Sequence, residues 1–195
     1  MNVPGGMRAR LEAELPRCPP GALIRQIYDS AIEFAKRSTS WRKWLHLDVV
    51  ANQTAYRLRP ATGANVTSVS EVVLGEDEAC GYPVPRSEYT LHVVGGDMTL
   101  LFRGSLGSAR SSWIHVRIIL EPIRGLVIDD EEWFIRWQDA IESHVVYMLA
   151  RKQRRPWTNI MASETAYRQY LRELERAKAS VLDIDGGSFN GGVNV

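Results

Sequence analysis

Residues 154–162 read RRPWTNIMA, and they stand between ARKQ at 150–153 and SETAYRQYLREL at 163–174. Four basic side chains gather within five positions here: Arg151, Lys152, Arg154 and Arg155. A proline and a tryptophan follow them directly, so the stretch permits two interpretations. It is either a nucleic-acid-binding patch with an aromatic platform or the joint between two helices. The residues on either side favour the joint.

Amphipathic helices are expected on both sides of this stretch. The upstream helix is predicted over about residues 130–152, with acidic residues at its start and the basic cluster at its end, as the helix dipole favours. Its apolar stripe has helical spacing and comprises Phe134, Trp137, Ile141, Val145 and Met148. The downstream helix is predicted over about residues 163–182, with Ser163 as its N-cap. Its apolar stripe comprises Tyr167, Tyr170, Leu171, Leu174 and Val181.

Pro156 and Trp157 are therefore interpreted as structural residues of a helix joint. Proline disfavours helical angles in the residue before it, which ends the upstream helix. The tryptophan ring, placed between two amphipathic helices, is expected to pack in the corner. The basic residues at 151–155 then either close a helix in solvent, contact an acidic partner or contact nucleic acid. The sequence leaves these alternatives open.

The rest of the chain changes character twice. A helix is predicted over about residues 20–37, after a short leading helix near residues 8–15. Alternating apolar residues then predict antiparallel strands between residues 41 and 122, with a hairpin turn at residues 95–97. The expected fold class is α+β. It is a helical bundle of three main helices, from residues 1–40 and 123–182, with an antiparallel β-sheet or sandwich at 41–122 inserted between the first and second helices. Residues 183–195 are glycine-rich and are expected to form a flexible tail.

Composition sets limits on function. The 195 residues carry a net charge of +1, whereas a protein that works by neutralising phosphates usually has a clear basic excess. The histidines and cysteines show no metal-binding spacing, and the common hydrolase and nucleotide-binding motifs are missing. We therefore expect no enzyme activity, no catalytic or metal-binding residues and no cofactor. No segment has the roughly 20 apolar residues that a membrane span requires, so no membrane partner is expected.

Several motifs occur in an order that resembles a known family. They are Cys18-Pro19, EFAKRSTSW at 33–41, YRLRP at 56–60, Trp133-x3-Trp137-x2-Ala140-Ile141, ARK at 150–152 and PWTNIMASETAYRQYLRELERAK at 156–178. This order resembles the head-to-tail adaptor proteins of tailed bacteriophages, also called connector or head completion proteins, over about residues 15–180. Ala35 departs from the pattern, because a cysteine is expected there, and the glycine-rich tail has no counterpart.

The resemblance implies a structural virion protein of the neck, assembled in the host cytoplasm. Such a protein forms a homo-oligomeric, dodecameric ring that joins the portal protein to tail or nozzle proteins and continues the channel through which genomic DNA passes. For contacts with the portal or a neighbouring subunit we expect Tyr167, Tyr170, Leu174, Phe189, Val193 and Val195. The alternatives are a nucleic-acid-binding accessory protein that uses residues 151–155, and another neck or tail component such as a tail terminator.

Overall fold

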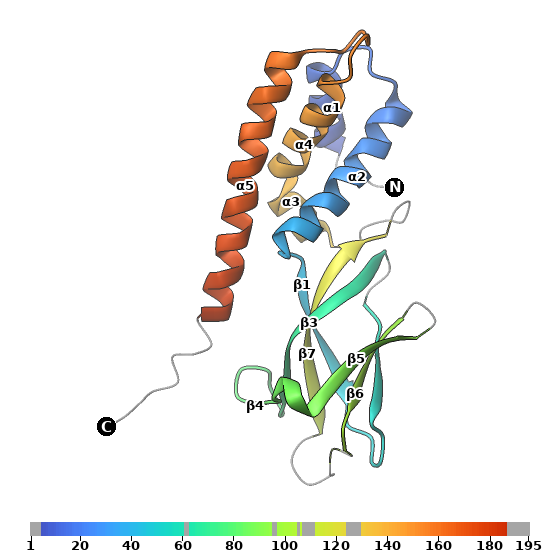
Figure 1. The fold of residues 1–195 in the computed structure, drawn as a ribbon, viewed down its shortest axis with the longest axis vertical. Helices are drawn as coiled ribbons and strands as arrows, with labels where there is room; N and C mark the ends of the chain where they lie inside the picture. The colour runs from blue at the N-terminus through green and yellow to red at the C-terminus, as the bar shows by residue number, and fades with distance from the viewer. Residues whose placement is uncertain are drawn as a thin grey trace, which may run out of the picture. The chain divides into compact units, whose positions relative to one another are not determined.

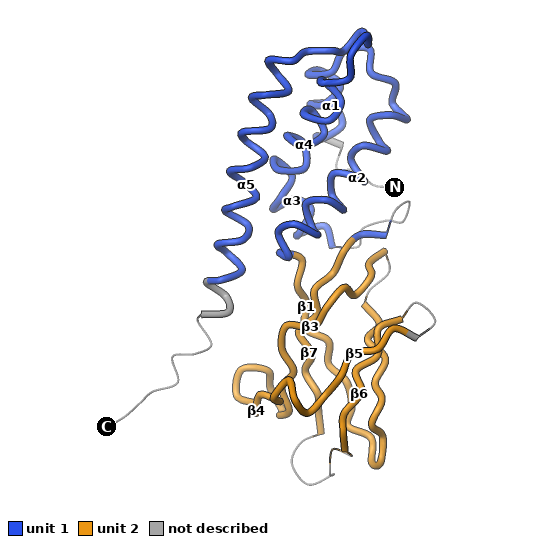
Figure 2. The backbone as a smooth tube through the Cα atoms, viewed as in Figure 1, with its two compact units in different colours: residues 1–40, 122–190 blue, residues 41–121, 191–195 orange. Residues whose placement is uncertain are grey.

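The computed structural model describes residues 5–60, 63–94, 97–104, 106, 112–123 and 130–186. The chain divides into two compact units (Figure 2). Unit 1 combines the described residues up to Ser40 with those from Pro122 onward, and unit 2 contains the described residues from Trp41 to Glu121. Segments that are far apart in the sequence therefore build unit 1 together.

Unit 1 consists of helices (Figure 1). Their bounds are α1 Gly5–Glu14, α2 Pro20–Ser38, α3 Glu131–Arg136, α4 Gln138–Ala150 and α5 Ile160–Gly186. Proline suits the first turn of α2, because the N–H that it lacks has no partner within the helix there. The helix is closed by Thr39, which has a φ of 51° and donates its N–H to the Ala35 carbonyl at 2.9 Å. Within the described ranges, no helix has both the length and the apolar character that crossing a membrane requires.

Aromatic side chains from several helices meet in the core of unit 1. Phe34 of α2 is fully buried. Its ring centroid lies 5.5 Å from that of Trp137, 6.2 Å from that of Trp133 and 6.3 Å from that of Tyr170 in α5. Aromatic pairs at such separations contribute about 0.5–1.5 kcal/mol each beyond the burial of their area. The helices before and after the β region are therefore held in one core.

Unit 2 contains two antiparallel sheets. The first has the order β1 (Arg42–Asp48), β7 (Trp113–Pro122), β3 (Ala64–Leu74), β4 (Tyr82–Pro83). The second has the order β2 (Ala55–Leu58), β6 (Asp97–Phe102), β5 (Tyr89–Val94), and the short 3-10 helix Arg86–Glu88 precedes β5. Strands β5 and β6 pair along their whole length in hairpin register. Residues 95 and 96 of the predicted turn lie outside the described residues.

Strand β7 supplies much of the core of unit 2. Its four aliphatic residues on one face are all buried: Ile114, Val116, Ile118 and Leu120. On the opposite face of β7, His115 and Arg117 are also buried. Arg117 lies 3.6 Å from the Glu71 carboxylate of β3, and its guanidinium stands over the Trp44 ring of β1 at 5.6 Å. A buried charge is tolerated when it is paired in this way. The centre of β7 is therefore buried on both faces, and its two edges are paired with β1 and β3.

The predicted architecture is wrong. The chain is a mixed α+β protein, but its described residues form five α-helices and seven strands in two sheets, with helices before and after the strands. The prediction was a bundle of three main helices with one inserted sheet region. The helix predicted over 130–152 is interrupted at Trp137, whose φ of −110° and ψ of 16° are not helical. Packing of this side chain on Phe34 overrides the local helix propensity.

Candidate assembly interface

The PWTN residues form a hydrogen-bonded joint between α4 and α5. Helix α4 ends at Ala150 and α5 begins at Ile160. The N–H of Asn159 donates to the Ala150 carbonyl at 2.8 Å, which ties the start of one helix to the end of the other. The Thr158 hydroxyl accepts a hydrogen bond from the Arg155 N–H at 3.1 Å. The side chains and backbone of this motif therefore fix the turn.

Asn159 also caps α5. Its side-chain oxygen accepts a hydrogen bond from the N–H of Ala162 at 3.0 Å, which is the N-cap interaction. The helix thus begins before Ser163, and the prediction of Ser163 as the N-cap is wrong. Ser163 is buried, and its hydroxyl donates to the Tyr147 carbonyl of α4 at 3.0 Å. It therefore ties α5 to α4.

Trp157 is half-buried beside the joint, and Pro156 is exposed. The Arg155 guanidinium stands over the Trp157 ring, 5.9 Å from its centroid. The indole nitrogen is buried and has no hydrogen-bond partner within the part of the chain that the structure describes. A nucleic-acid base that stacked on this face of the ring would have to displace Arg155.

The basic residues at 151–155 are exposed, and one of them, Arg151, contacts a pair of tyrosines. Tyr147 of α4 and Tyr167 of α5 are stacked, with ring centroids 4.5 Å apart. The Arg151 guanidinium lies 4.9 Å from the centroid of the Tyr147 ring and donates a hydrogen bond to its hydroxyl. Tyrosine and arginine are enriched among the residues that dominate interface energetics. We call this surface the basic patch; it comprises Tyr147, Arg151, Lys152, Arg154, Arg155 and Tyr167.

The other residues predicted for an interface have different positions. Tyr170 and Leu174 are fully buried in the core of unit 1, whereas Tyr167 is 36% exposed. Phe189, Val193 and Val195 lie outside the described residues. The apolar stripe of α5 thus identifies mainly the face that packs inside unit 1. Of the predicted residues that the structure describes on α5, Tyr167 is accessible to a partner.

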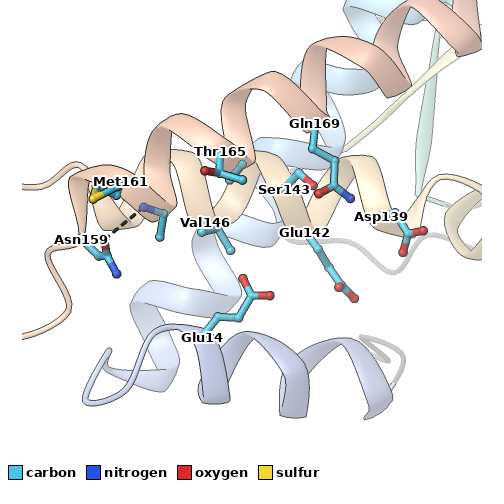
Figure 3. A pocket seen from close by; sticks show the side chains of 11 residues that line it. Glu14, Asp139, Glu142, Ser143, Val146, Asn159, Met161, Thr165 and Gln169 are labelled. Carbon is cyan, nitrogen blue, oxygen red and sulfur yellow. Dashed lines mark hydrogen bonds between the residues drawn. The ribbon is translucent and has the colours of Figure 1, made fainter.

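A groove of about 580 Å³ lies between α1, α4 and α5 (Figure 3). Three carboxylates line it, Glu14 from α1 and Asp139 and Glu142 from α4, and we call it the acidic groove. Its other lining residues are Ser143, Val146, Asn159, Met161, Ala162, Thr165, Ala166 and Gln169. The Met161 side chain is 81% exposed. The groove therefore offers an apolar contact beside its negative charges.

Sequence reasoning missed this groove because three helices contribute to it. Arg10 of α1 donates from Nε to both carboxylate oxygens of Glu142 at 3.1 Å, which ties α1 to α4. That hydrogen bond, together with the charge of Glu142, raises the pKa of Arg10. A signal was present in α4, where Asp139, Ser143 and Val146 recur at steps of four and three. This spacing does not indicate which other helices line the groove.

One grouping of side chains in unit 2 is suited to a metal ion. His46, Glu78 and His115 each offer a ligand atom, and these atoms all lie within 4.8 Å of one another. It is the one such grouping found among the described residues. No metal ligands were expected from the sequence, because these three residues are far apart along the chain and strand pairing brings the two histidines together.

Comparison with known proteins gives weak similarities only. No protein-family model and no curated protein matches the chain. The chain is similar to a solved structure from the neck of an empty gene transfer agent (GTA) particle computed with C6 symmetry, with 13% identity and a TM-score of 0.36 over 91% of this chain and 92% of that chain. It is also similar to one from the virion of a native GTA particle, with 14% identity and a TM-score of 0.35 over the same shares. TM-scores below 0.5 do not establish a shared fold or function.

Proposed function

We propose that the protein is a structural subunit of a virion neck, an adaptor ring that joins the portal to the tail and continues the DNA channel. The observation that carries the proposal is the joint between α4 and α5. Its PWTN residues are the strongest of the motifs that resemble the head-to-tail adaptors, and they have a definite structural role. Thr158 and Asn159 fix the turn by hydrogen bonds. A fixed turn presents the basic patch in one orientation.

We assign the contact between neighbouring subunits to two surfaces of unit 1. A closed ring uses a heterologous interface, in which one surface of each copy contacts a different surface of the next. The basic patch and the acidic groove have opposite charges. They are different surfaces, because no residue of the basic patch, Tyr167 included, is among the residues that line the groove. Complementary charges fix the register of an interface and suppress wrong partners. The basic patch of one subunit therefore enters the acidic groove of its neighbour.

The remaining roles come from the resemblance and belong to the proposal. The ring is dodecameric, with the portal protein on one side and tail or nozzle proteins on the other. Tyr167 contacts the portal or the neighbouring subunit. Genomic DNA passes through the channel, and the protein performs no covalent chemistry in this role.

Charge-reversal variants test the subunit contact. Glu14→Lys and Arg154→Glu should each lower the number of copies that co-purify with the portal, because each places like charges opposite one another. The double variant should recover a large part of the loss. Glu164→Lys is the matched control, since Glu164 is exposed on α5 and lies outside both surfaces. Single variants that assemble like the wild type would count against this contact.

Nucleic-acid binding is the second candidate function, because four basic side chains are exposed together at residues 151–155. Titration with duplex DNA at low and high salt separates it from the adaptor role. A protein that binds DNA by neutralising phosphates with these side chains would lose affinity steeply with salt, and Arg154→Glu would reduce that slope. Binding weaker than about millimolar at low salt, below even typical non-specific affinities, would exclude this function.

A further inference from the structure

The histidine pair of unit 2 lies where two neighbouring strands meet. His46 of β1 and His115 of β7 are direct partners in the antiparallel register. Their Nδ1 atoms are 2.7 Å apart, and the Glu78 Oε2 atom lies 3.9 Å from Nδ1 of His115. Three electron-pair donors from three separate segments therefore converge on one point. We propose that His46, His115 and Glu78 form a binding site for a divalent transition-metal cation of the Zn²⁺ type.

The second nitrogen of His115 makes a hydrogen bond that leaves the Nδ1 lone pair available to a metal ion. Its Nε2 atom lies 3.1 Å from the Gly75 carbonyl oxygen, which can only accept a hydrogen bond. Nε2 therefore carries the proton, and Nδ1 keeps its lone pair toward His46 and Glu78. Metal-binding histidines almost always donate their other N–H to a carbonyl or carboxylate, which fixes the tautomer and the ring orientation. His115 is 3% exposed, so its ring is also held by packing.

The loop that carries Glu78 is held close to these histidines by a backbone hydrogen bond and by two glycines. The Gly75 N–H donates to the Trp113 carbonyl of β7 at 3.3 Å, which fastens the loop to the same strand as His115. A Cβ on Gly75 would stand 2.6 Å from Cα of Gly81, and a Cβ on Gly81 would stand 2.3 Å from a methyl group of Val73. Both contacts are too short for any side chain. The two glycines thus let the loop close tightly and return to β4 with Glu78 on the histidine side.

The donor set selects the class of cation. Two imidazole nitrogens and one carboxylate suit Zn²⁺ and its transition-metal neighbours, whereas Mg²⁺ and Ca²⁺ prefer oxygen ligands. Tetrahedral Zn²⁺ with bonds of about 2.0–2.1 Å places two nitrogen ligands roughly 3.3 Å apart. The histidines must therefore separate by about 0.6 Å. His46 is exposed and Glu78 is half-exposed, so these two side chains can adjust around the fixed His115. Three protein ligands leave a fourth position for water or a partner's side chain.

Titration of the chelator-treated, full-length protein with Zn²⁺ is the first test. Calorimetry should show one saturable site per chain. Co²⁺ in place of Zn²⁺ should give the visible absorption of a four-coordinate ion with nitrogen ligands. The protein should also unfold at a higher temperature with Zn²⁺ present, because the ion binds the folded state. A wild-type protein that shows no saturable binding up to about millimolar Zn²⁺, far above the affinity of structural sites, overturns the proposal.

Matched variants locate the site. His46→Ala and Glu78→Gln change accessible side chains, so both should fold. Each should weaken Zn²⁺ binding by more than the roughly 10- to 100-fold that loss of a second-shell partner causes. The controls are His92→Ala on β5 and Glu76→Gln in the same loop as Glu78, and both should bind Zn²⁺ like the wild type. Wild-type affinity in His46→Ala would show that Zn²⁺ binds elsewhere and that the pair is only a histidine–histidine hydrogen bond.

Discussion

Asn159 acts twice at the joint, through its backbone N–H to Ala150 and through its side chain to the N–H of Ala162. Asn159→Ala removes only the side-chain cap and should lower the free energy of unfolding by about 1 kcal/mol. Asn159→Asp keeps an acceptor oxygen and should lose less. Urea denaturation followed by circular dichroism measures both values. An alanine variant as stable as the wild type would contradict the capping role.

His144 makes the helical unit sensitive to acid. Its ring is buried 4.5 Å from the Tyr170 ring, and its Nδ1 lies 3.0 Å from the Ser30 hydroxyl. Burial lowers the pKa of this imidazole below its ordinary value of 6.5, although Glu33 opposes the shift. The unfolded chain therefore binds this proton more readily than the folded chain. The stability that neutral His144 provides is complete above pH 6.5 and is lost as the pH falls from there toward the folded pKa.

The variant His144→Gln isolates this effect. It keeps a hydrogen-bonding group near Ser30 but cannot titrate. Its free energy of unfolding should fall less than that of the wild type between about pH 7.5 and about pH 5.5, the range in which histidine changes charge. Because the two proteins differ only at residue 144, the difference between their pH dependences isolates the contribution of His144. Equal pH dependence in the two proteins would show that His144 carries none of it.

At the scale of elements, α5 has a face inside unit 1 and a face open to partners. Leu174→Ala removes a fully buried side chain and should cost about 2–5 kcal/mol of unfolding free energy. Tyr167→Ala loses mainly the stack on Tyr147, which is worth at most about 1.5 kcal/mol. When equal concentrations of folded protein are compared, Tyr167→Ala should reduce assembly with the portal more than Leu174→Ala does. Equal assembly by Tyr167→Ala and the wild type would remove Tyr167 from the interface.

Elements with regular spacing could be read from the sequence, and those shaped by packing could not. The apolar steps after Pro20 predict a helix over 20–37, and α2 spans Pro20–Ser38. The break at Trp137 follows from its contact with Phe34, which no local pattern records. The basic patch was visible because its charges are contiguous. The acidic groove and the histidine pair were not visible, because three helices and two paired strands, respectively, bring their residues together.

At the scale of the whole molecule, the two proposals lie in different units of the chain. The basic patch and the acidic groove belong to unit 1, whereas His46, Glu78 and His115 belong to unit 2. Glu14→Lys should therefore leave Zn²⁺ binding unchanged, and its effect on assembly reports on the ring contact alone. A result that contradicts the ring contact would therefore not contradict the metal site, and the reverse also holds.

The adaptor proposal is tested most directly by the mass of the complex that the protein forms with the portal of its own particle. Native mass spectrometry of the co-purified complex gives the number of copies. The proposal predicts a closed dodecameric ring of this chain on the portal, which the Glu14→Lys variant weakens. A chain that remains a monomer in the presence of the portal would contradict it.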